Sequence, residues 1–224
     1  MELLSDELFE VAQPVWDKSV THPFVVHLAK GDLDKERFCN YMTQDYLYLM
    51  SYIKIFGIIM QKTQDIDEIK FASDNIAALL DETIRVHIPY MKSLGITDQD
   101  IQASRAHPDN LAYTSYMAQI AAQNNYLAGL IAILGCSWGY AYIAQKATEI
   151  YPQSLSTSPY KSWFASYIHP SYVKTNQDLI DRCDDLAQNI DQEEKGRLIE
   201  IFYTCCVFEY RFWNMLIAHS SVLD

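Results

Sequence analysis

Apolar residues recur along this chain at helical spacing, and the alternation of apolar and polar residues typical of strands is scarce. Such a repeat places the apolar side chains on one face of a helix. Glycine, proline and short polar segments mark the predicted helix ends. We expect helices at about 5–19, 21–31, 34–62, 65–94, 97–104, 108–123, 125–149, 159–168, 171–188 and 191–219, with a polar loop at 153–158. Because no repeat, low-complexity tract or linker divides the chain, the pattern predicts one all-α domain, a helical bundle over residues 1–224.

Three of the predicted helices each carry one reactive side chain within an apolar or aromatic face. Asp45, Cys136 and Glu209 occupy these positions. Their neighbours at helical spacing are Tyr41, Tyr48 and Tyr52 for Asp45; Ile133, Tyr140 and Ile143 for Cys136; and Cys205, Phe212 and Leu216 for Glu209. Burying an ionised carboxylate without a partner is very unfavourable, so a chain that does it twice has a use for the groups. The pattern predicts that a thiol and two acids meet in one small, aromatic-lined pocket.

Each of these residues also has a purely structural interpretation, which the sequence leaves open. Cys136 could be an inert core thiol, because a nucleophilic thiol needs a group that stabilises the thiolate and no cation lies nearby in sequence. Glu209 could bond tyrosine hydroxyls instead of acting as a general acid. Asp45 could bridge two helices instead of accepting N–H bonds from a flat nitrogenous ring stacked on tyrosines.

The composition fits a globular protein and argues against several kinds of partner. Half of the 224 residues are hydrophobic, 13% are aromatic, and the formal net charge is −12. Without a run of Lys or Arg, the chain lacks an electrostatic footprint for nucleic acid or anionic lipid. Five cysteines without CxxC spacing, and no evident signal peptide, are typical of a cytoplasmic protein.

The segment 110–145 contains no charged side chain, and 127–144 approaches the length of a membrane span. It is a solitary candidate, has no flanking basic cluster and follows several Gln and Asn residues. We therefore expect the central helix of a soluble bundle and no membrane partner.

Metal and haem sites find little support in the sequence. Di-iron bundles use Glu-x-x-His pairs, and none of the six histidines has a carboxylate three residues before it. His22 or His27 could in principle ligate a haem, but both fit ordinary histidines of a loop or a short helix. We expect no metal site.

Five segments, in order, resemble signatures of the TenA/thiaminase II family, and together they cover nearly the whole chain. They are His22-Pro-Phe-Val, Gly31-Asp-Leu and Phe38-x-x-Tyr41-x-x-Gln44-Asp45-x-x-Tyr48-Leu49 as the opening; Tyr113-Thr114-Ser115-Tyr116-Met117; Cys136-Ser-Trp138-Gly-Tyr140; Tyr160-x-x-Trp163-x-x-x-Tyr167; and Glu209-Tyr210-x-Phe212-Trp213. Cys136 is typical of the cysteine-bearing branch of that family. The chain departs from the family pattern at Asp32-Leu33-Asp34, where Thr-Leu-Pro is common, at Gly135, where Pro is common, and at Gly139, where a larger residue is common. These departures affect the pocket shape and substrate preference that the resemblance implies.

The resemblance implies a haem-oxygenase-like α-helical fold without haem, usually assembled as a homotetramer. It implies an aminopyrimidine aminohydrolase, or thiaminase II, of thiamine salvage that requires no cofactor. The substrate would be 4-amino-5-aminomethyl-2-methylpyrimidine or thiamine itself, and the product 4-amino-5-hydroxymethyl-2-methylpyrimidine.

The resemblance also implies a role for each site residue. Cys136 would add to the pyrimidine ring, Glu209 would protonate the departing amine and later help deprotonate water, and Asp45 would bind the ring nitrogen or the 4-amino group. The implied substrate-binding residues are Tyr48, Tyr113 and Phe212 as walls of the ring site, Tyr140 and Tyr167 as hydrogen-bond donors near the thiol, and Tyr52.

Two other functions remain open. One is a catalytically idle relative that binds a pyrimidine or another small molecule. The other is a haem or di-metal protein on a similar helical scaffold. A transcriptional regulator has no support, because an acidic chain without a basic recognition helix is poorly suited to DNA.

Overall fold

The computed structural model describes residues 3–217, and every element in this range is a helix. The all-α prediction is therefore confirmed. The elements are α1 (Leu4–Val20), α2 (Pro23–Lys30), α3 (Lys35–Met60), α4 (Ile66–Glu82), the π-helix η1 (Thr83–His87), α5 (Ile88–Ser93), α6 (Asp98–Ala103), α7 (Pro108–Gln123), α8 (Tyr126–Ile150), the 3₁₀-helix η2 (Pro152–Leu155), α9 (Lys161–Tyr167), α10 (Pro170–Leu186) and α11 (Gln192–Ile217).

Two predicted segments were wrong in detail. The continuous helix expected at 65–94 is interrupted by η1, and the loop expected at 153–158 begins inside η2. Pro89 accounts for the first difference, because proline lacks an N–H and its ring clashes with the carbonyl four residues earlier. The predicted end of the last helix at 219 lies outside the described residues.

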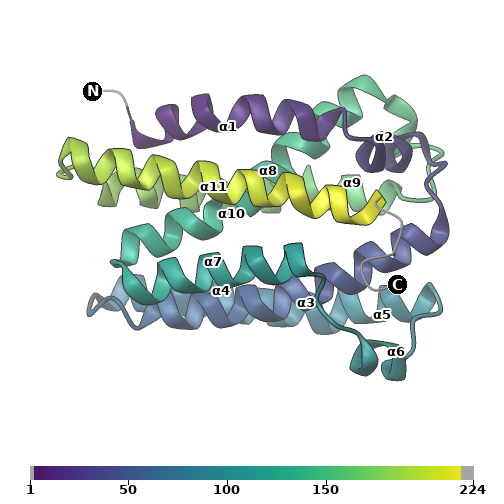
Figure 1. Ribbon diagram of the computed structural model, residues 1–224, viewed down its shortest axis with the longest axis horizontal. Coiled ribbons are helices and arrows are strands. Elements are labelled where there is room, and N and C mark those ends of the chain that lie inside the picture. The colour runs from purple at the N-terminus through teal and green to yellow at the C-terminus, as the bar shows by residue number, and fades with distance from the viewer. Residues whose placement is uncertain (1–2, 218–224) are drawn as a thin grey trace. The chain divides into compact units, whose positions relative to one another are not determined.

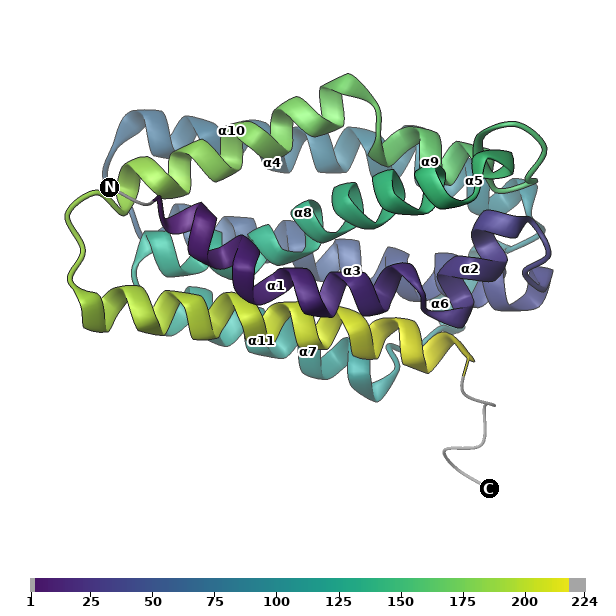
Figure 2. The same ribbon diagram turned by 90° about the horizontal axis from the view of Figure 1, so that it is seen from above.

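By its internal contacts, the chain divides into two compact units. The first unit contains the residues before Lys35 together with those from Leu134 on. In it, α1 packs along α11, as Figures 1 and 2 show, and also contacts α10. Helix α2 contacts α1, α11 and η2, while α9 contacts η2 and α10.

The second unit is Lys35–Ile133. Its long helix α3 packs against α4 and α7 (Figure 1), and also contacts η1 and α5. The first turns of α8 belong to this unit, where Gly129 lies against Ile59 of α3. The prediction that residues 1–224 form a single domain stays a prediction.

One described helix, α8, is long and apolar enough to cross a membrane by length and composition. However, 72% of its most apolar 18-residue window is buried inside the structure. The core helix of a soluble protein has the same properties, so the burial supports the central-helix prediction.

Three helices begin with the same two residues, histidine followed by proline. His22, His107 and His169 are the N-caps of α2, α7 and α10. In each case the imidazole Nδ1 accepts a hydrogen bond from the backbone N–H two residues later, at 3.2–3.3 Å. Proline suits the first helical position because the N–H it lacks would have no partner there. The sequence pair His-Pro therefore explains these helix starts without any metal or haem.

His22 also fixes its own tautomer, and this gives a prediction for stability. Its Nδ1 accepts from Phe24, so its Nε2 carries the proton and donates to Asn214 at 3.2 Å. Burial lowers the pKa of His22 below its ordinary value of 6.5, and the bond to Asn214 partly offsets this. Since the unfolded chain then binds the extra proton more readily, the contribution of His22 to stability is present above about pH 6.5 and is lost as the pH falls.

We expect His22→Asn to weaken the loss of stability on acidification, because asparagine caps helices and does not titrate in this range. His22→Ala should lower the free energy of unfolding by about 1 kcal/mol at pH 7.5, through loss of the cap. Urea unfolding at pH 7.5 and pH 5.5 measures both effects. Equal pH dependence in the wild-type and His22→Asn proteins would contradict the assignment.

Candidate active site

Asp45 lies on α3 in the second unit, and its residue is only 8% exposed. Burial raises the pKa of its carboxyl to about 6, while the charge of His87 lowers it and the charge of Glu82 raises it. The carboxylate contacts the imidazole of His87, whose Nε2 lies 3.7 Å from Oδ2 of Asp45. Asp45 is therefore mostly ionised at pH 7, although it is removed from water. It also bridges α3 to η1, so the structural interpretation of Asp45 holds beside the functional one.

The residue before Asp45 fixes this part of α3. Oε1 of Gln44 accepts hydrogen bonds from the backbone N–H of His107 (2.9 Å) and from Nδ2 of Asn110 (3.1 Å). Its Nε2 donates to the carbonyl of Arg105 at 2.9 Å, and Asn110 also donates to the carbonyl of Gln44 at 2.8 Å. Both ends of the buried amide are thus satisfied, which ties α3 to the start of α7.

Three of the predicted aromatic residues form one cluster beside Asp45. Tyr48 stacks on Tyr52 with ring centroids 5.6 Å apart, and it lies 5.4 Å from Tyr113 of α7. The hydroxyl of Tyr52 donates to the carbonyl of Ile133 at 3.0 Å, and that of Tyr48 lies 3.8 Å from the sulfur of Met117. All three tyrosines are buried. The structure therefore joins Tyr48, Tyr52 and Tyr113 in one aromatic cluster, and Asp45 lies one turn before Tyr48 on α3.

In the first unit, the helices that carry Cys136 and Glu209 approach each other closely. A Cβ atom added at Gly135 of α8 would lie 3.3 Å from Cβ of Cys205 and 3.6 Å from Sγ of Cys206, both on α11. Gly135 directly precedes Cys136, and Cys205 lies one helical turn before Glu209. The missing side chain of Gly135 thus lets α8 and α11 meet at the level of the predicted nucleophile and acid.

Glu209 is a buried carboxylate, with 3% of the residue exposed, while Cys136 is half-buried. Cys205 and Cys206 are fully buried beside it. Burial raises the pKa of both thiols, and the negative charge of Glu209 raises it further. Both therefore remain protonated at neutral pH and fill space between the helices.

Tyr140 and Tyr167 meet in the first unit, with ring centroids 4.8 Å apart. Trp163 and Trp213 complete the cluster, at 5.9 Å and 5.3 Å from Tyr140. Phe212 is buried and lies 6.2 Å from Trp213. Because Tyr140 is one turn from Cys136 on α8, this aromatic cluster extends along the helix face that carries the thiol.

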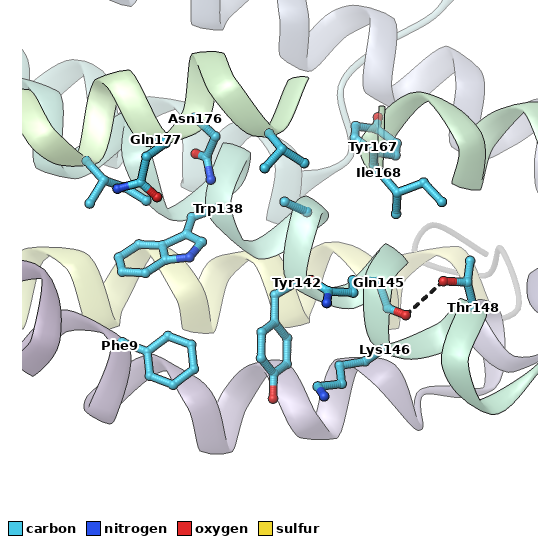
Figure 3. Close-up of a pocket in the computed structure, with 13 residues that line it drawn as sticks. Phe9, Trp138, Tyr142, Gln145, Lys146, Thr148, Tyr167, Ile168, Asn176 and Gln177 are labelled. Atoms are coloured by element: carbon cyan, nitrogen blue, oxygen red, sulfur yellow. Dashed lines mark hydrogen bonds between the residues drawn. The ribbon is translucent and has the colours of Figure 1, made fainter. Parts of the chain in front are cut away.

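A pocket of about 590 Å³ lies in the first unit, lined by residues of α1, α8, α9 and α10 (Figure 3). Phe9, Trp138 and Tyr142 line it with their rings, and of the predicted site residues Tyr167 contributes. Trp138 and Tyr142 lie about 200° and 240° around α8 from Cys136, at about 100° per residue. This pocket is therefore on a different face of α8 from the predicted nucleophile.

His87 is the functional candidate that sequence reasoning missed. In the sequence His87 has no carboxylate three residues before it, so it does not fit a di-iron motif, and no other local pattern marks it. Two signals could have identified it: the buried Asp45 needs a cationic partner, and Pro89 forces an irregular turn beside it. No group of three His, Cys, Asp or Glu residues within 3–217 is arranged to hold a metal ion.

Comparisons with known proteins give a consistent result. The model of the TENA/THI-4/PQQC family matches residues 10–218. The chain is 34% identical over 208 residues to the aminopyrimidine aminohydrolase of Halalkalibacterium halodurans, covering 93% of this chain and 92% of that protein.

Two solved structures support the fold. A protein from a Silicibacter species, described as a TenA family transcription regulator, is 26% identical, with a TM-score of 0.87 over 96% of this chain and 97% of that one. A Shewanella denitrificans domain of unknown function with a heme oxygenase-like fold is 17% identical, with a TM-score of 0.76 over 96% of this chain and 92% of that one. The predicted haem-oxygenase-like fold is confirmed.

The third departure from the family pattern, Gly139, gives a prediction for stability. A Cβ atom at Gly139 would lie 2.9 Å from Nε1 of Trp16, a fully buried ring of α1. We therefore expect Gly139→Ala to lower the free energy of unfolding by about 1–3 kcal/mol, because the overpacked site must shift. Gly196→Ala in α11 is the matched control, since nothing lies within 4 Å of its added Cβ.

The control should instead gain about 0.5–1 kcal/mol, because alanine restricts the unfolded chain more than glycine does. Urea unfolding of the three proteins measures the difference. A gain in stability for Gly139→Ala equal to that of the control would show that Trp16 does not limit this site.

Proposed function

Because the chain belongs to the TENA/THI-4/PQQC family, we infer that it is a hydrolase that acts on aminopyrimidines in thiamine salvage. It converts 4-amino-5-aminomethyl-2-methylpyrimidine and water to the 5-hydroxymethyl pyrimidine and ammonia, and thiamine is a second candidate substrate. The observation that carries this conclusion is the likeness to an aminopyrimidine aminohydrolase over 93% of the chain, with Asp45, Cys136 and Glu209 at the spacing of the family signatures.

We propose that Cys136, Glu209 and Asp45 carry the reaction. Cys136 is the nucleophile: its sulfur adds to the pyrimidine ring and turns the aromatic ring into an electron-rich enamine. The enamine expels the amine from the exocyclic methylene group, which an intact aromatic ring does poorly. The half-buried position of Cys136 supports this role, since a nucleophile must be reached by its substrate.

Glu209 is the general acid and base. Its carboxyl gives a proton to the departing amine and takes one from the attacking water, so it returns to its starting state after one turnover. Water oxygen then bonds to the methylene carbon. The Cys136 sulfur leaves the ring and takes back the proton that its thiol passed to a ring nitrogen on addition, which restores the aromatic ring. Burial of Glu209 supports the role, because proton transfer by a positioned carboxyl is effective in a site with little water.

As an ionised carboxylate, Asp45 accepts a hydrogen bond from the 4-amino group or from the ring nitrogen when that nitrogen is protonated. Hydrogen bonds to a carboxylate are about twice as strong as neutral ones, and Asp45 is mostly ionised at neutral pH because its pKa is about 6. Tyr48, Tyr113 and Phe212 wall the flat ring, and Tyr52 supports Tyr48. Tyr140 and Tyr167 act as donors near the thiol.

The same family membership supports three further proposals about the chain in the cell. We propose that it assembles as a homotetramer, works in the cytoplasm and binds neither membrane nor nucleic acid. The net charge of −12 supports the last of these. The catalytic proposal uses only side chains of this chain and requires no cofactor.

We expect Cys136→Ser to lower kcat by at least about 10²-fold, because a serine hydroxyl is a far weaker nucleophile at neutral pH. The substrate should still bind, since Asp45 and the tyrosines are unchanged. Cys39→Ser is the matched control, a second half-buried cysteine that stands outside the proposed site. Product formation from the aminomethyl pyrimidine and from thiamine is measured side by side as kcat/KM, together with substrate binding by calorimetry.

Retained turnover in Cys136→Ser would overturn the nucleophile assignment. Binding without turnover in the wild-type protein would favour the idle binding relative instead. The ratio of the two kcat/KM values identifies the preferred leaving group.

The tetramer is tested separately. We expect light scattering after size exclusion to give four times the chain mass of 25.9 kDa. A mass of one or two chains at micromolar concentration would contradict the proposed assembly.

A further inference from the structure

His87 is half-buried against Asp45 in the second unit, with 13% of its side chain exposed and 11% of that of Asp45. Its Nε2 lies 3.3 Å from the backbone carbonyl of Met42 and 3.7 Å from Oδ2 of Asp45. A carbonyl oxygen has no proton to give, so Nε2 carries the proton and donates it. The N–H edge of the imidazole is therefore fixed by the backbone of α3 and faces the carboxylate one turn further along the same helix.

The backbone that presents His87 is unusual. Thr83–His87 forms a π-helix, in which the N–H of Ile88 bonds the carbonyl of Thr83, five residues back. Pro89 follows directly and cannot continue an α-helical hydrogen-bond ladder. One extra residue in the turn changes the direction of every later side chain, and π-turns are frequent at functional sites. The irregular turn thus accounts for how His87 reaches α3.

We propose that His87 is a positioning residue that keeps the carboxylate of Asp45 ionised and oriented for binding of the pyrimidine. This inference rests on the proposed role of Asp45. The contact of His87 is with Oδ2, so Oδ1 serves the ring N–H or amino group. A cationic imidazole also offsets part of the cost of burying the carboxylate, as in other buried ion pairs whose partner is removed only at a large cost in stability.

Two charged groups near Asp45 shift the pKa of its carboxyl in opposite directions. His87 of η1 lowers its pKa, and Glu82 at the end of α4 raises it. On the side of α7, the neutral residues Asn110 and Tyr113 contact α3 beside Asp45, and the titratable His107 contacts Gln44 through its backbone N–H. His87 and Glu82 therefore give two substitutions with opposite expected signs at one carboxylate.

The test compares the pH dependence of kcat/KM in three variants. In His87→Gln the positive charge is lost, so the pKa of Asp45 rises and the acid limb of the profile moves to higher pH. We expect kcat/KM at pH 6, relative to its plateau, to fall about threefold or more. In Glu82→Gln the limb should move to lower pH. Asp81→Asn is the matched control, because it removes the same charge from a neighbouring exposed carboxylate that is already paired with Arg85.

The orientation part of the proposal needs a second variant. His87→Leu removes both the charge and the N–H donor, so its plateau should fall further than that of His87→Gln, mainly through a higher KM. Far-UV circular dichroism and thermal unfolding of each variant show whether the fold is kept. If His87→Gln leaves the acid limb in place while Asp45→Asn abolishes it, His87 does not act on Asp45 and the proposal is overturned.

A direct titration separates this inference from the proposed function. The carboxyl carbon-13 signal of Asp45, identified by its loss in Asp45→Asn, reports ionisation without any substrate. We expect its midpoint to rise in His87→Gln and to fall in Glu82→Gln. An unchanged midpoint in His87→Gln refutes the inference whatever the activity. Absence of turnover with a shifted midpoint refutes the proposed function and leaves the His87–Asp45 pair intact.

Discussion

Two carboxylates lie in apolar and aromatic surroundings, and removing an ionised carboxylate from water is unfavourable unless other groups compensate. For Asp45 the compensation comes from the imidazole of His87. The helical turn that carries Asp45 is fixed by the satisfied amide of Gln44. The contact of His87 depends on the π-turn at Thr83–His87. The bonds of Gln44 depend on the backbone at the start of α7, which lies beside α3. The local irregularities of the second unit thus follow from holding one charge away from solvent.

In the first unit the governing constraint is close helix packing. Gly135 and Gly139 stand one turn apart on α8, the first against α11 and the second against Trp16 of α1. These are also two of the positions at which the chain departs from the family pattern. The departures have a packing reason, since larger residues would push α8 away from the helices beside it. Gly135 also sets how closely α8, which carries Cys136, approaches α11, which carries Glu209.

Most of the fold was accessible from the sequence because its signals are local. His-Pro pairs start helices, Gly31 ends α2 in the left-handed conformation with φ of +82°, and the apolar faces place Asp45 beside Tyr48 and Tyr52. The π-turn was missed because helical periodicity tolerates one extra residue without an obvious break in the pattern. The contact of His87 with Asp45 was missed for a different reason: it joins residues 42 positions apart, which a pattern along one helix cannot reveal.

A π-turn holds one residue more than a turn of α-helix. Every side chain after it therefore points about 100° away from its direction in a continuous α-helix. The segment Thr83–His87 makes this change of direction between α4 and α5, and Met91 of α5, which follows it, is fully buried. A continuous α-helix over the same residues would turn both the imidazole and Met91 to other directions. Substitutions of its exposed residues, such as Ile84 and Val86, do not change the direction of the side chains that follow. The π-helical backbone of this segment, more than the identity of its exposed side chains, therefore sets the direction of His87 and Met91.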